Sequence, residues 1–491
     1  MKIGGIRTGC SEKKETSQIL ADRGHGRICR KDIIMALPFY ARSETNQGYI
    51  KNMEVIAFDP DRGLPGGGQP QIYKISDDKY YLYATMRNEI GIWDVSDPSK
   101  PELLRHFAPV DEETYPTTDN PKIQVANDLL IVAHCSGSGP AFMERPPIDP
   151  EKHKAMNGIS IYSIKEDPVN PEFLSYWDNG VPFAMGVHRF MYDGGRYAYL
   201  SSDARGFEGL ILRIIDLEDP KNPKEAGRWW LPEQFADGYP GRTFDPGAAH
   251  IPSFMDKGWL HGPPFVVDGI AYCGYSGAGV VTLDVSDPTR PMCLGRLQLM
   301  PAFSGGLAGA RTHTVMKLPG QPFVVATNEG ERFHTFDPEE LKKNFVAQPM
   351  NNLHMIDVRD PSRPTLVAEF PYPEVPENFP FKNFNEAYLG VQGPFGPHNI
   401  HEPMPGKEGI EKRGDRVYCC YFGAGLRVYD VSDPYYVKEI AYFIPPNPAN
   451  EKHPFLPGPV MALTEDVVVD DRGYIYITTN GDGMYILRVL V

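Results

Sequence analysis

The chain has 491 residues, of which 41% are hydrophobic, 23% charged and 11% aromatic, so it can bury a large core and general disorder is excluded. Its 48 glycines and 48 prolines are spread along the sequence, which excludes an all-helical bundle and favours many short strands joined by turns. The formal net charge of −15 repels phosphate backbones and anionic lipids, so we expect neither nucleic acid nor a membrane as a partner.

Targeting and redox signals are weak. No window approaches the roughly 18 uninterrupted apolar residues of a membrane span, and residues 1–22 lack the apolar stretch of a signal peptide, which predicts a cytoplasmic protein. The seven cysteines form neither a disulfide framework nor a CxxC zinc pair.

Residues 1–50 show no strand periodicity and many basic side chains, and we interpret them as an N-terminal arm that could join subunits of a homo-oligomer. Disorder of the first twenty is the alternative.

One phrase recurs along residues 51–491, typified by Trp93-Asp94-Val95-Ser96-Asp97-Pro98. A short apolar run follows each copy, which predicts a strand, a tight turn and an outer strand. The aspartates are explained by capping these turns, so they do not indicate calcium sites. The six copies carry Asp97-Pro98, Asp167-Pro168, Asp219-Pro220, Asp287-Pro288, Asp360-Pro361 and Asp433-Pro434.

A hairpin precedes each phrase, so each repeat holds four strands. A seventh repeat, from Val467 to Leu487, lacks an outer strand, and the lone strand Met53–Phe58 is placed to supply it. The sequence therefore predicts an all-β protein, a seven-bladed β-propeller of four-stranded blades, closed by an N-terminal strand that pairs with the C-terminal blade.

The Asp-Val-Ser-Asp-Pro phrases resemble those of the LVIVD-repeat proteins, over roughly residues 53 to 491. This resemblance implies a β-propeller and names no reaction, so function has to be argued from a site.

Histidines fall at the expected heads of inner strands, where residues from separate blades would converge on the propeller axis. Neutral imidazoles with one or two carboxylates suit a transition metal, iron first, with manganese or zinc as alternatives. Each histidine alone could instead be a packed structural residue. The predicted metal ligands are His188, His261, His313 and His398.

Other polar residues fall near the same end of the blades. We expect Glu329 and Glu465 to orient imidazoles, and His401, Asp203 or Tyr275 to move protons. His401 is also an alternative to His398 as a ligand.

Long segments rich in aromatic residues, proline and glycine lead into several inner strands, such as Phe370 to Pro397 and Ile444 to Thr464. Long loops over one face favour a pocket for an apolar or aromatic small molecule, with subunit contacts as the alternative. Nucleotide-binding and serine-hydrolase motifs are absent from the sequence.

These features lead to a metal-dependent enzyme, with oxygenase chemistry as the first hypothesis. The inferred layout is similar to that of carotenoid-cleaving oxygenases, propellers with a four-histidine axial iron, although their sequence motifs are not found here. A non-redox manganese or zinc lyase, isomerase or hydrolase is the second hypothesis. A binding or assembly propeller without catalysis is the third.

Overall fold

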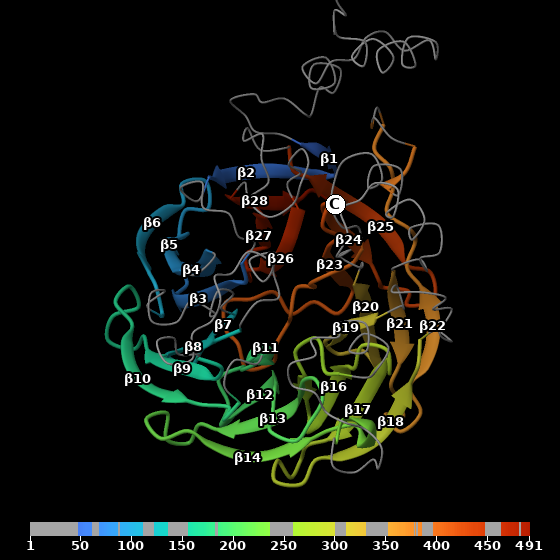
Figure 1. Ribbon diagram of the computed structural model, residues 1–491. Coiled ribbons are helices and arrows are strands. Elements are labelled where there is room, and N and C mark those ends of the chain that lie inside the picture. Colours follow the sequence, from blue (N-terminus) through green and yellow to red (C-terminus); the bar gives the residue numbers. More distant parts are fainter. Residues whose placement is uncertain are drawn as a thin grey trace, which may run out of the picture.

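Seven four-stranded antiparallel sheets surround a central axis in the computed structural model (Figure 1). This arrangement confirms the predicted seven-bladed, all-β propeller. No helix in the part of the chain described has the length and apolar character needed to cross a bilayer. The structure describes residues 48–60, 68–86, 89–110, 122–135, 156–181, 185–235, 259–299, 311–329, 352–377, 379, 382–384, 396–446, 463–480 and 483–491.

Blades 1 to 5 are each built from four consecutive strands, ordered from the axis outwards. In chain order these strands are β3 (Pro70–Ser76), β4 (Lys79–Met86), β5 (Glu89–Asp94) and β6 (Glu102–Phe107); β7 (Lys122–Ala126), β8 (Leu129–Ala133), β9 (Ile159–Ser163) and β10 (Glu172–Trp177); β11 (Val187–Met191), β12 (Tyr197–Ser202), β13 (Ile211–Asp216) and β14 (Lys224–Trp229), followed by the short 3-10 helix η3 (Pro232–Gln234); β15 (Phe265–Val267), β16 (Ile270–Gly274), β17 (Val280–Asp284) and β18 (Met292–Leu297); and β19 (Arg311–Lys317), β20 (Phe323–Glu329), β21 (Leu353–Asp357) and β22 (Thr365–Glu369).

The last two blades each take a strand from the N-terminal part of the chain. In blade 7, β2 (Met53–Asp59) pairs antiparallel with β28, from Met53 opposite Val489 to Asp59 opposite Met484. In blade 6, β1 (Tyr49–Lys51) pairs with β25 and begins inside the range assigned to the N-terminal arm; residues 1–47 of that arm lie outside the described residues. The other strands of blade 6 are β23 (Arg416–Cys420), β24 (Leu426–Asp430) and β25 (Lys438–Ile444). Those of blade 7 are β26 (Leu463–Val469), β27 (Tyr474–Asn480) and β28 (Gly483–Val489).

The recurring aspartates cap the turns between third and outer strands, as predicted. Asp94 Oδ1 accepts a hydrogen bond from the Ser96 N–H at 2.9 Å, and Asp97 Oδ1 accepts one from the Ser99 N–H at 3.0 Å. The same pair of bonds recurs at Asp284 and Asp287 in blade 4. Each side chain replaces a backbone partner that the tight turn leaves out.

Blade 6 has four strands, but not the four that the sequence predicts. Its fourth strand is β1, next to β25, and the segment on the axial side of β23 forms only an isolated bridge. Ile400 forms an isolated bridge with Cys419, and the His401 N–H donates to the Tyr418 carbonyl at 3.0 Å. The His398 N–H donates to the Cys420 carbonyl at 2.8 Å, and the Cys420 N–H donates to the Asn399 carbonyl at 2.9 Å. Residues 398 and 399 therefore both stand opposite a single residue of β23, Cys420.

Three other inner strands carry a register shift near their heads. The shift lies between Val187 and Arg189 in β11, between Thr312 and Val315 in β19, and between Thr464 and Asp466 in β26. Such β-bulges add a residue to one strand and redirect its side chains. Each bulge falls on a residue predicted to belong to the site, namely His188, His313 or Glu465.

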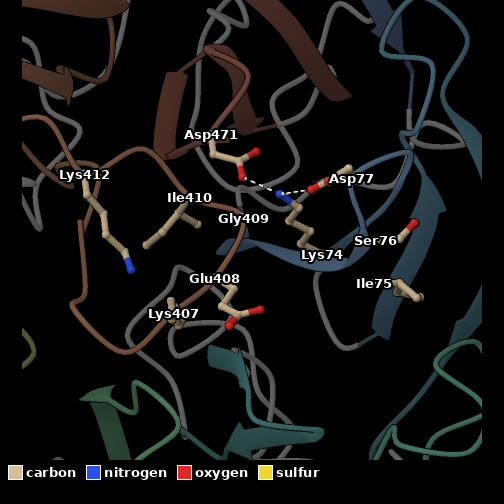
Figure 2. A pocket seen from close by; sticks show the side chains of 10 residues that line it. All are labelled: Lys74, Ile75, Ser76, Asp77, Lys407, Glu408, Gly409, Ile410, Lys412 and Asp471. Atoms are coloured by element: carbon tan, nitrogen blue, oxygen red, sulfur yellow. Dashed lines mark hydrogen bonds and ion pairs between the residues drawn. The ribbon is translucent and has the colours of Figure 1, made fainter.

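Residues 402–412, here called the axial segment, contact the inner strands of several blades. The Lys407 ammonium donates to the side-chain amide oxygens of Gln71 on β3 and Gln124 on β7. The Asp471 N–H donates to the Gly409 carbonyl at 2.9 Å, which ties the segment to blade 7. A groove of about 610 Å³ lies beside the axial segment (Figure 2). It is lined by Lys74 to Asp77, Lys407 to Ile410, Lys412 and Asp471.

Arg472 joins blade 7 to blade 1 at the junction where the ring closes. Its guanidinium lies 3.8 Å from the centre of the Tyr80 ring and donates to the carbonyls of Val95 at 3.0 Å and Ser96 at 2.9 Å. It also pairs at 2.7 Å with Asp470, whose side chain is fully buried. One planar side chain thus satisfies a buried carboxylate and two carbonyls of the neighbouring blade.

We predict that Arg472→Met lowers the free energy of unfolding by about 3 kcal/mol, because it leaves the Asp470 carboxylate buried without its charge partner. Urea unfolding monitored by circular dichroism would measure the change. Arg488→Met, which removes an exposed arginine 5.7 Å from the Tyr474 ring, is the matched control and should cost less than about 1 kcal/mol. Equal losses in the two variants would contradict the closing role of Arg472.

Candidate metal centre

The four predicted histidine ligands come from four consecutive blades and form an arc at one end of the channel. His188 lies on β11, His261 just before β15, His313 on β19 and His398 on the segment bridged to β23. The ring centres of His188 and His261 are 5.3 Å apart, those of His261 and His313 4.3 Å, and those of His313 and His398 4.9 Å. The structure therefore brings together the imidazoles that are distant in sequence.

Glycines allow blades 4 and 5 to approach closely enough for this arc. A Cβ atom at Gly274 would lie 2.0 Å from the His313 carbonyl oxygen, and one at Gly262 would lie 2.1 Å from the same atom. No side chain fits at these distances, so glycine at both positions is required for the observed placement of β19.

The carboxylate of Glu329, the last residue of β20, lies between three of the imidazoles. Its Oε2 is 3.3 Å from Nε2 of His261 and 3.9 Å from Nε2 of His313, and its Oε1 is 3.6 Å from Nε2 of His398. Two overlapping sets could hold a metal ion, His188 with His261 and His313, and His313 with Glu329 and His398, each with ligand atoms within 4.8 Å of one another.

The outward nitrogen of His398 is held by blade 7. Its Nδ1 lies 2.9 Å from the carbonyl oxygen of Glu465 and 3.4 Å from Oε2 of the same residue. The side-chain amide nitrogen of Asn399 lies 3.1 Å from the same Nδ1 and donates to the Glu465 carbonyl at 2.9 Å. In the neutral tautomer whose Nδ1 donates to the Glu465 carbonyl, Nε2 presents its lone pair toward Glu329. Glu465 thus lies beside the imidazole of His398, and its backbone carbonyl is closer to that ring than its carboxylate is.

Two further histidines have outward partners. His313 Nδ1 is 2.8 Å from the hydroxyl of Thr314, and His188 Nδ1 is 3.7 Å from the thiol sulfur of Cys135. Such contacts fix the plane of an imidazole and leave its other nitrogen for a ligand. Burial, followed by the neighbouring His261 and His398, holds the pKa of His313 well below its ordinary value, so this ring is neutral near pH 7.

Aromatic side chains flank the arc at both ends. The Trp259 ring centre lies 4.4 Å from that of His261, and the Phe422 ring stacks on His398 at 4.6 Å. Phe422 has a φ of 48°, a left-handed conformation that bulky residues seldom adopt outside functional sites. The walls described next to the imidazoles are thus partly apolar.

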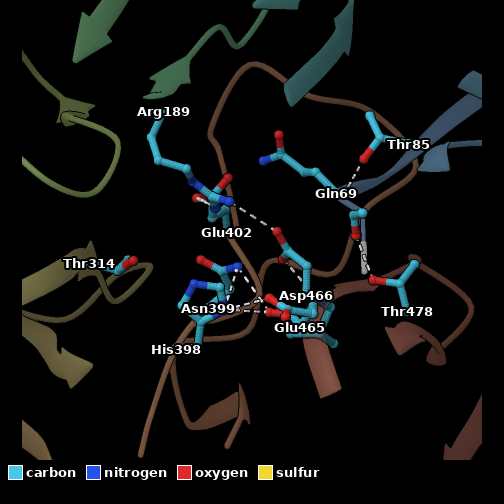
Figure 3. A network of polar contacts seen from close by, with 12 residues as sticks. Gln69, Thr85, Arg189, Thr314, His398, Asn399, Glu402, Glu465, Asp466 and Thr478 are labelled. Atoms are coloured by element: carbon cyan, nitrogen blue, oxygen red, sulfur yellow. Dashed lines mark hydrogen bonds and ion pairs between the residues drawn. The ribbon is translucent and has the colours of Figure 1, made fainter. Parts of the chain in front are cut away.

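A buried ionic network adjoins the histidines (Figure 3). Arg189, the residue after His188, has its guanidinium 3.2 Å from Asp466 Oδ2 and 3.6 Å from Glu402 Oε1. Burial raises the pKa of Asp466 to about 7 although Arg189 opposes this shift. Arg189 was not among the predicted site residues, and the available signal was a charge directly beside a candidate ligand in an otherwise buried strand.

His401 has a structural role in place of the predicted proton transfer. Its Nδ1 accepts the Val469 N–H at 3.2 Å, and its Nε2 donates to the Glu411 carbonyl at 2.9 Å. Both ring nitrogens therefore have backbone partners, and His398, not His401, is the one of the two that lies in the imidazole arc.

Two other predicted proton-transfer residues are also placed in structural positions. Asp203 Oδ2 accepts the Gly186 N–H at 2.6 Å, at the start of blade 3, and burial raises its pKa to about 7. Tyr275 is buried in the hydrophobic cluster between blades 3 and 4, where its ring packs edge-on against Trp229 at 5.4 Å. Most of the long segments predicted to cover the site lie outside the described residues.

We predict that His401 makes the folding stability depend on pH in one direction. Burial lowers its pKa to about 4, below the value near 6.5 of an unfolded histidine, so its stabilising contribution is complete above pH 6.5 and is lost as the pH falls toward 4. Relative to His401→Gln, the wild-type protein should lose about 1.4 kcal/mol per pH unit in this window. Urea unfolding of both proteins at pH 7, 6 and 5 would measure this difference in the free energy of unfolding. The same dependence of that free energy on pH in the two proteins would contradict the prediction.

Comparison with known proteins bears on the fold and the family. A model of the LVIVD repeat matches residues 74–108, 266–298 and 344–371. A search of curated proteins found no match. Among solved structures, the β-propeller domain of Cps50 (Swd1) from Myceliophteria thermophila has a TM-score of 0.48 and 10% identity, covering 89% of this chain and 100% of that one. A streptogramin B lyase has a TM-score of 0.47 and 10% identity, covering 90% and 98%.

The structural likenesses carry no information about activity at this level of identity. The segments that match the LVIVD repeat are informative about the fold, because they fall on the strands and Asp-Pro turns of blades 1, 4 and 5. This chain is a seven-bladed β-propeller in which three segments match the LVIVD repeat.

Proposed function

We propose that the histidine arc binds a transition metal ion and that the protein is a metal-dependent enzyme. The proposed ligands are the four histidines of the arc together with the Glu329 carboxylate. Four imidazole nitrogens and one carboxylate oxygen suit iron, manganese or zinc and are poor ligands for magnesium or calcium. Glu465 then orients His398 and does not bind the metal.

One observation carries this proposal. When His398 Nδ1 donates to the Glu465 carbonyl, the Nε2 lone pair of the neutral ring faces Glu329, whose oxygen is 3.6 Å away. Two acceptors facing each other repel, so a cation between them stabilises the arrangement. His261 and His313 direct Nε2 toward the same carboxylate, and the pKa of His313 is held low, which keeps that ring in its metal-binding form.

The walls of the site support an organic substrate that is apolar or aromatic. Trp259 and Phe422 flank the arc, and aromatic faces bind planar apolar groups. With iron bound, the centre would supply oxygen activation, which is our first hypothesis for the reaction. The residues of the chain would hold the substrate against the arc, and the Arg189 network would keep a fixed charge distribution around it.

A non-redox reaction is the second candidate, and the Asp466 carboxyl favours it. Its pKa of about 7 lets it both accept and release a proton near neutral pH, which lyase and isomerase chemistry requires. Zinc or manganese would then polarise a carbonyl or carboxylate of the substrate.

The metal centre predicts about one equivalent of transition metal in protein purified without chelators, measured by inductively coupled plasma mass spectrometry. Replacing His313 and His398 together with alanine should reduce this to less than about a tenth, because the two ligand sets share His313 and the second also needs His398.

His401→Gln is the matched control, since His401 is buried, as His313 is, but is bonded to backbone groups, and this variant should retain the metal. Circular dichroism would confirm that all variants keep their sheets. Metal-free wild-type protein, or unchanged metal in the double variant, would overturn the centre and favour a non-catalytic binding propeller.

The oxygenase hypothesis and the non-redox hypothesis make opposite predictions for the consumption of oxygen. Metal-stripped protein reloaded with Fe²⁺ should consume oxygen, measured by an electrode, when offered a panel of phenols and aryl alkenes, whereas Zn²⁺-loaded protein should not. Conversion of any panel member by the Zn²⁺ form under nitrogen would establish the non-redox alternative instead.

A further inference from the structure

The indole of Trp259 borders the two imidazoles that begin the histidine arc. Its ring centre is 4.4 Å from that of His261 and 6.1 Å from that of His188. The backbone that follows holds it there, because the Leu260 N–H donates to the Leu210 carbonyl of blade 3 at 2.9 Å and the His261 N–H donates to the end of β16 at 2.9 Å. The junction of blades 3 and 4 therefore sets the position of the indole beside the arc.

The N–H of this indole is buried, and no described residue accepts a hydrogen bond from it. Trp259 as a whole is only 9% exposed. A buried indole N–H usually has an acceptor, and Trp93 in blade 1 follows this rule, since its Nε1 donates to Asp59 Oδ2 at 2.9 Å. The donor left over beside the arc therefore points to a ligand that carries an acceptor.

The place of this donor decides which part of a ligand it meets. The N–H belongs to the ring system whose centre lies 4.4 Å from that of His261, so an oxygen that accepts from it belongs to a molecule bound against the arc. The apolar part of the same molecule would contact the imidazoles and the aromatic walls of the site. A neutral carbonyl oxygen satisfies the donor without adding a second negative charge near the Glu329 carboxylate.

We propose that the Trp259 N–H donates a hydrogen bond to a carbonyl oxygen of the substrate, so that the enzyme acts on aromatic carbonyl compounds. This inference rests on the proposed function and deepens it. Trp259 would then determine specificity as well as provide an apolar wall, because a molecule of the same shape without the oxygen leaves a buried donor unpaired.

Isothermal titration calorimetry with acetophenone and α-methylstyrene tests this inference, since the two probes have the same shape and differ by an oxygen in place of a methylene group. Zn²⁺-loaded protein is used, so that the probes are not oxidised. Wild-type protein should bind acetophenone more tightly. Trp259→Phe should lower the ratio of the two affinities about tenfold, because phenylalanine keeps an aromatic ring but has no donor. The smaller ring area affects both probes alike and leaves the ratio unchanged.

Trp177→Phe is the matched control. Trp177 is also 9% exposed, but it lies on the outer strand β10 of blade 2, where its ring packs against the Arg213 guanidinium at 4.5 Å. This variant should show the same affinity ratio as the wild type. Thermal melting would confirm that both phenylalanine variants are folded.

The indole N–H can also be observed directly by NMR spectroscopy of ¹⁵N-labelled, Zn²⁺-loaded protein. The chain has five tryptophans, and the indole signal that is lost in Trp259→Phe identifies that of Trp259. Saturating acetophenone should move the proton of this signal downfield, as expected when an N–H gains an acceptor, and α-methylstyrene should not.

Three results would overturn the inference: no binding of acetophenone to metal-replete protein, an affinity ratio that Trp259→Phe leaves unchanged, or an indole signal that acetophenone does not move. Metal content measured on the same samples separates this failure from failure of the metal centre. Any of these results with metal-replete protein contradicts only the role of the indole, whereas wild-type protein that does not bind metal contradicts the proposed function.

Discussion

The β-bulge near the head of the inner strand is the constraint on which the site depends. A regular strand sends neighbouring side chains to opposite faces, so only every second residue can reach the same space. The bulge in β11 lets His188 stack on His261 while Arg189 reaches Asp466, and the bulge in β26 likewise gives Glu465 to His398 and Asp466 to Arg189. The imidazole arc and the ionic network are thus built from adjacent residues.

This geometry brings charged groups close together in a poorly solvated channel. Arg189 is nearly fully buried and is shared by two carboxylates, and one of these, Asp466, is held at a pKa of about 7. Leaving any one member without its partner would be more costly than removing the whole set, so the network stabilises a single arrangement of β11, β26 and the axial segment. The same rigidity fixes the imidazoles at their mutual distances.

The sequence contained enough information for the fold and for most of the arc. Regular Asp-Pro turns marked the blades, because an aspartate capping a tight turn leaves a local signature. The histidines were found because each precedes a hairpin turn by a similar spacing. Positions were less certain where the bulges occur, since counting along a strand with a period of two fails as soon as a residue is inserted.

The residues that were misassigned or missed have a common cause. His401 and Asp203 were chosen for residue type and position, but backbone groups that no sequence pattern reveals already occupy their polar atoms. Tyr275 faces the neighbouring blade, which depends on the packing of two sheets. Arg189 was missed because its sequence neighbours do not reveal that the assembled ring buries its guanidinium beside Asp466 and Glu402.

The pairing of β1 with blade 6 and of β2 with blade 7 has a consequence for biosynthesis. A ribosome releases residues 49–59 before the strands of blades 1 to 5, yet the partner strands β25 and β28 emerge only after those five blades have been made. Until then the nascent chain must keep two strand edges from joining other polypeptides. His398 belongs to blade 6, so the arc can be completed only after blades 1 to 5 have been made, when β1 and β2 can meet the strands of the last two blades.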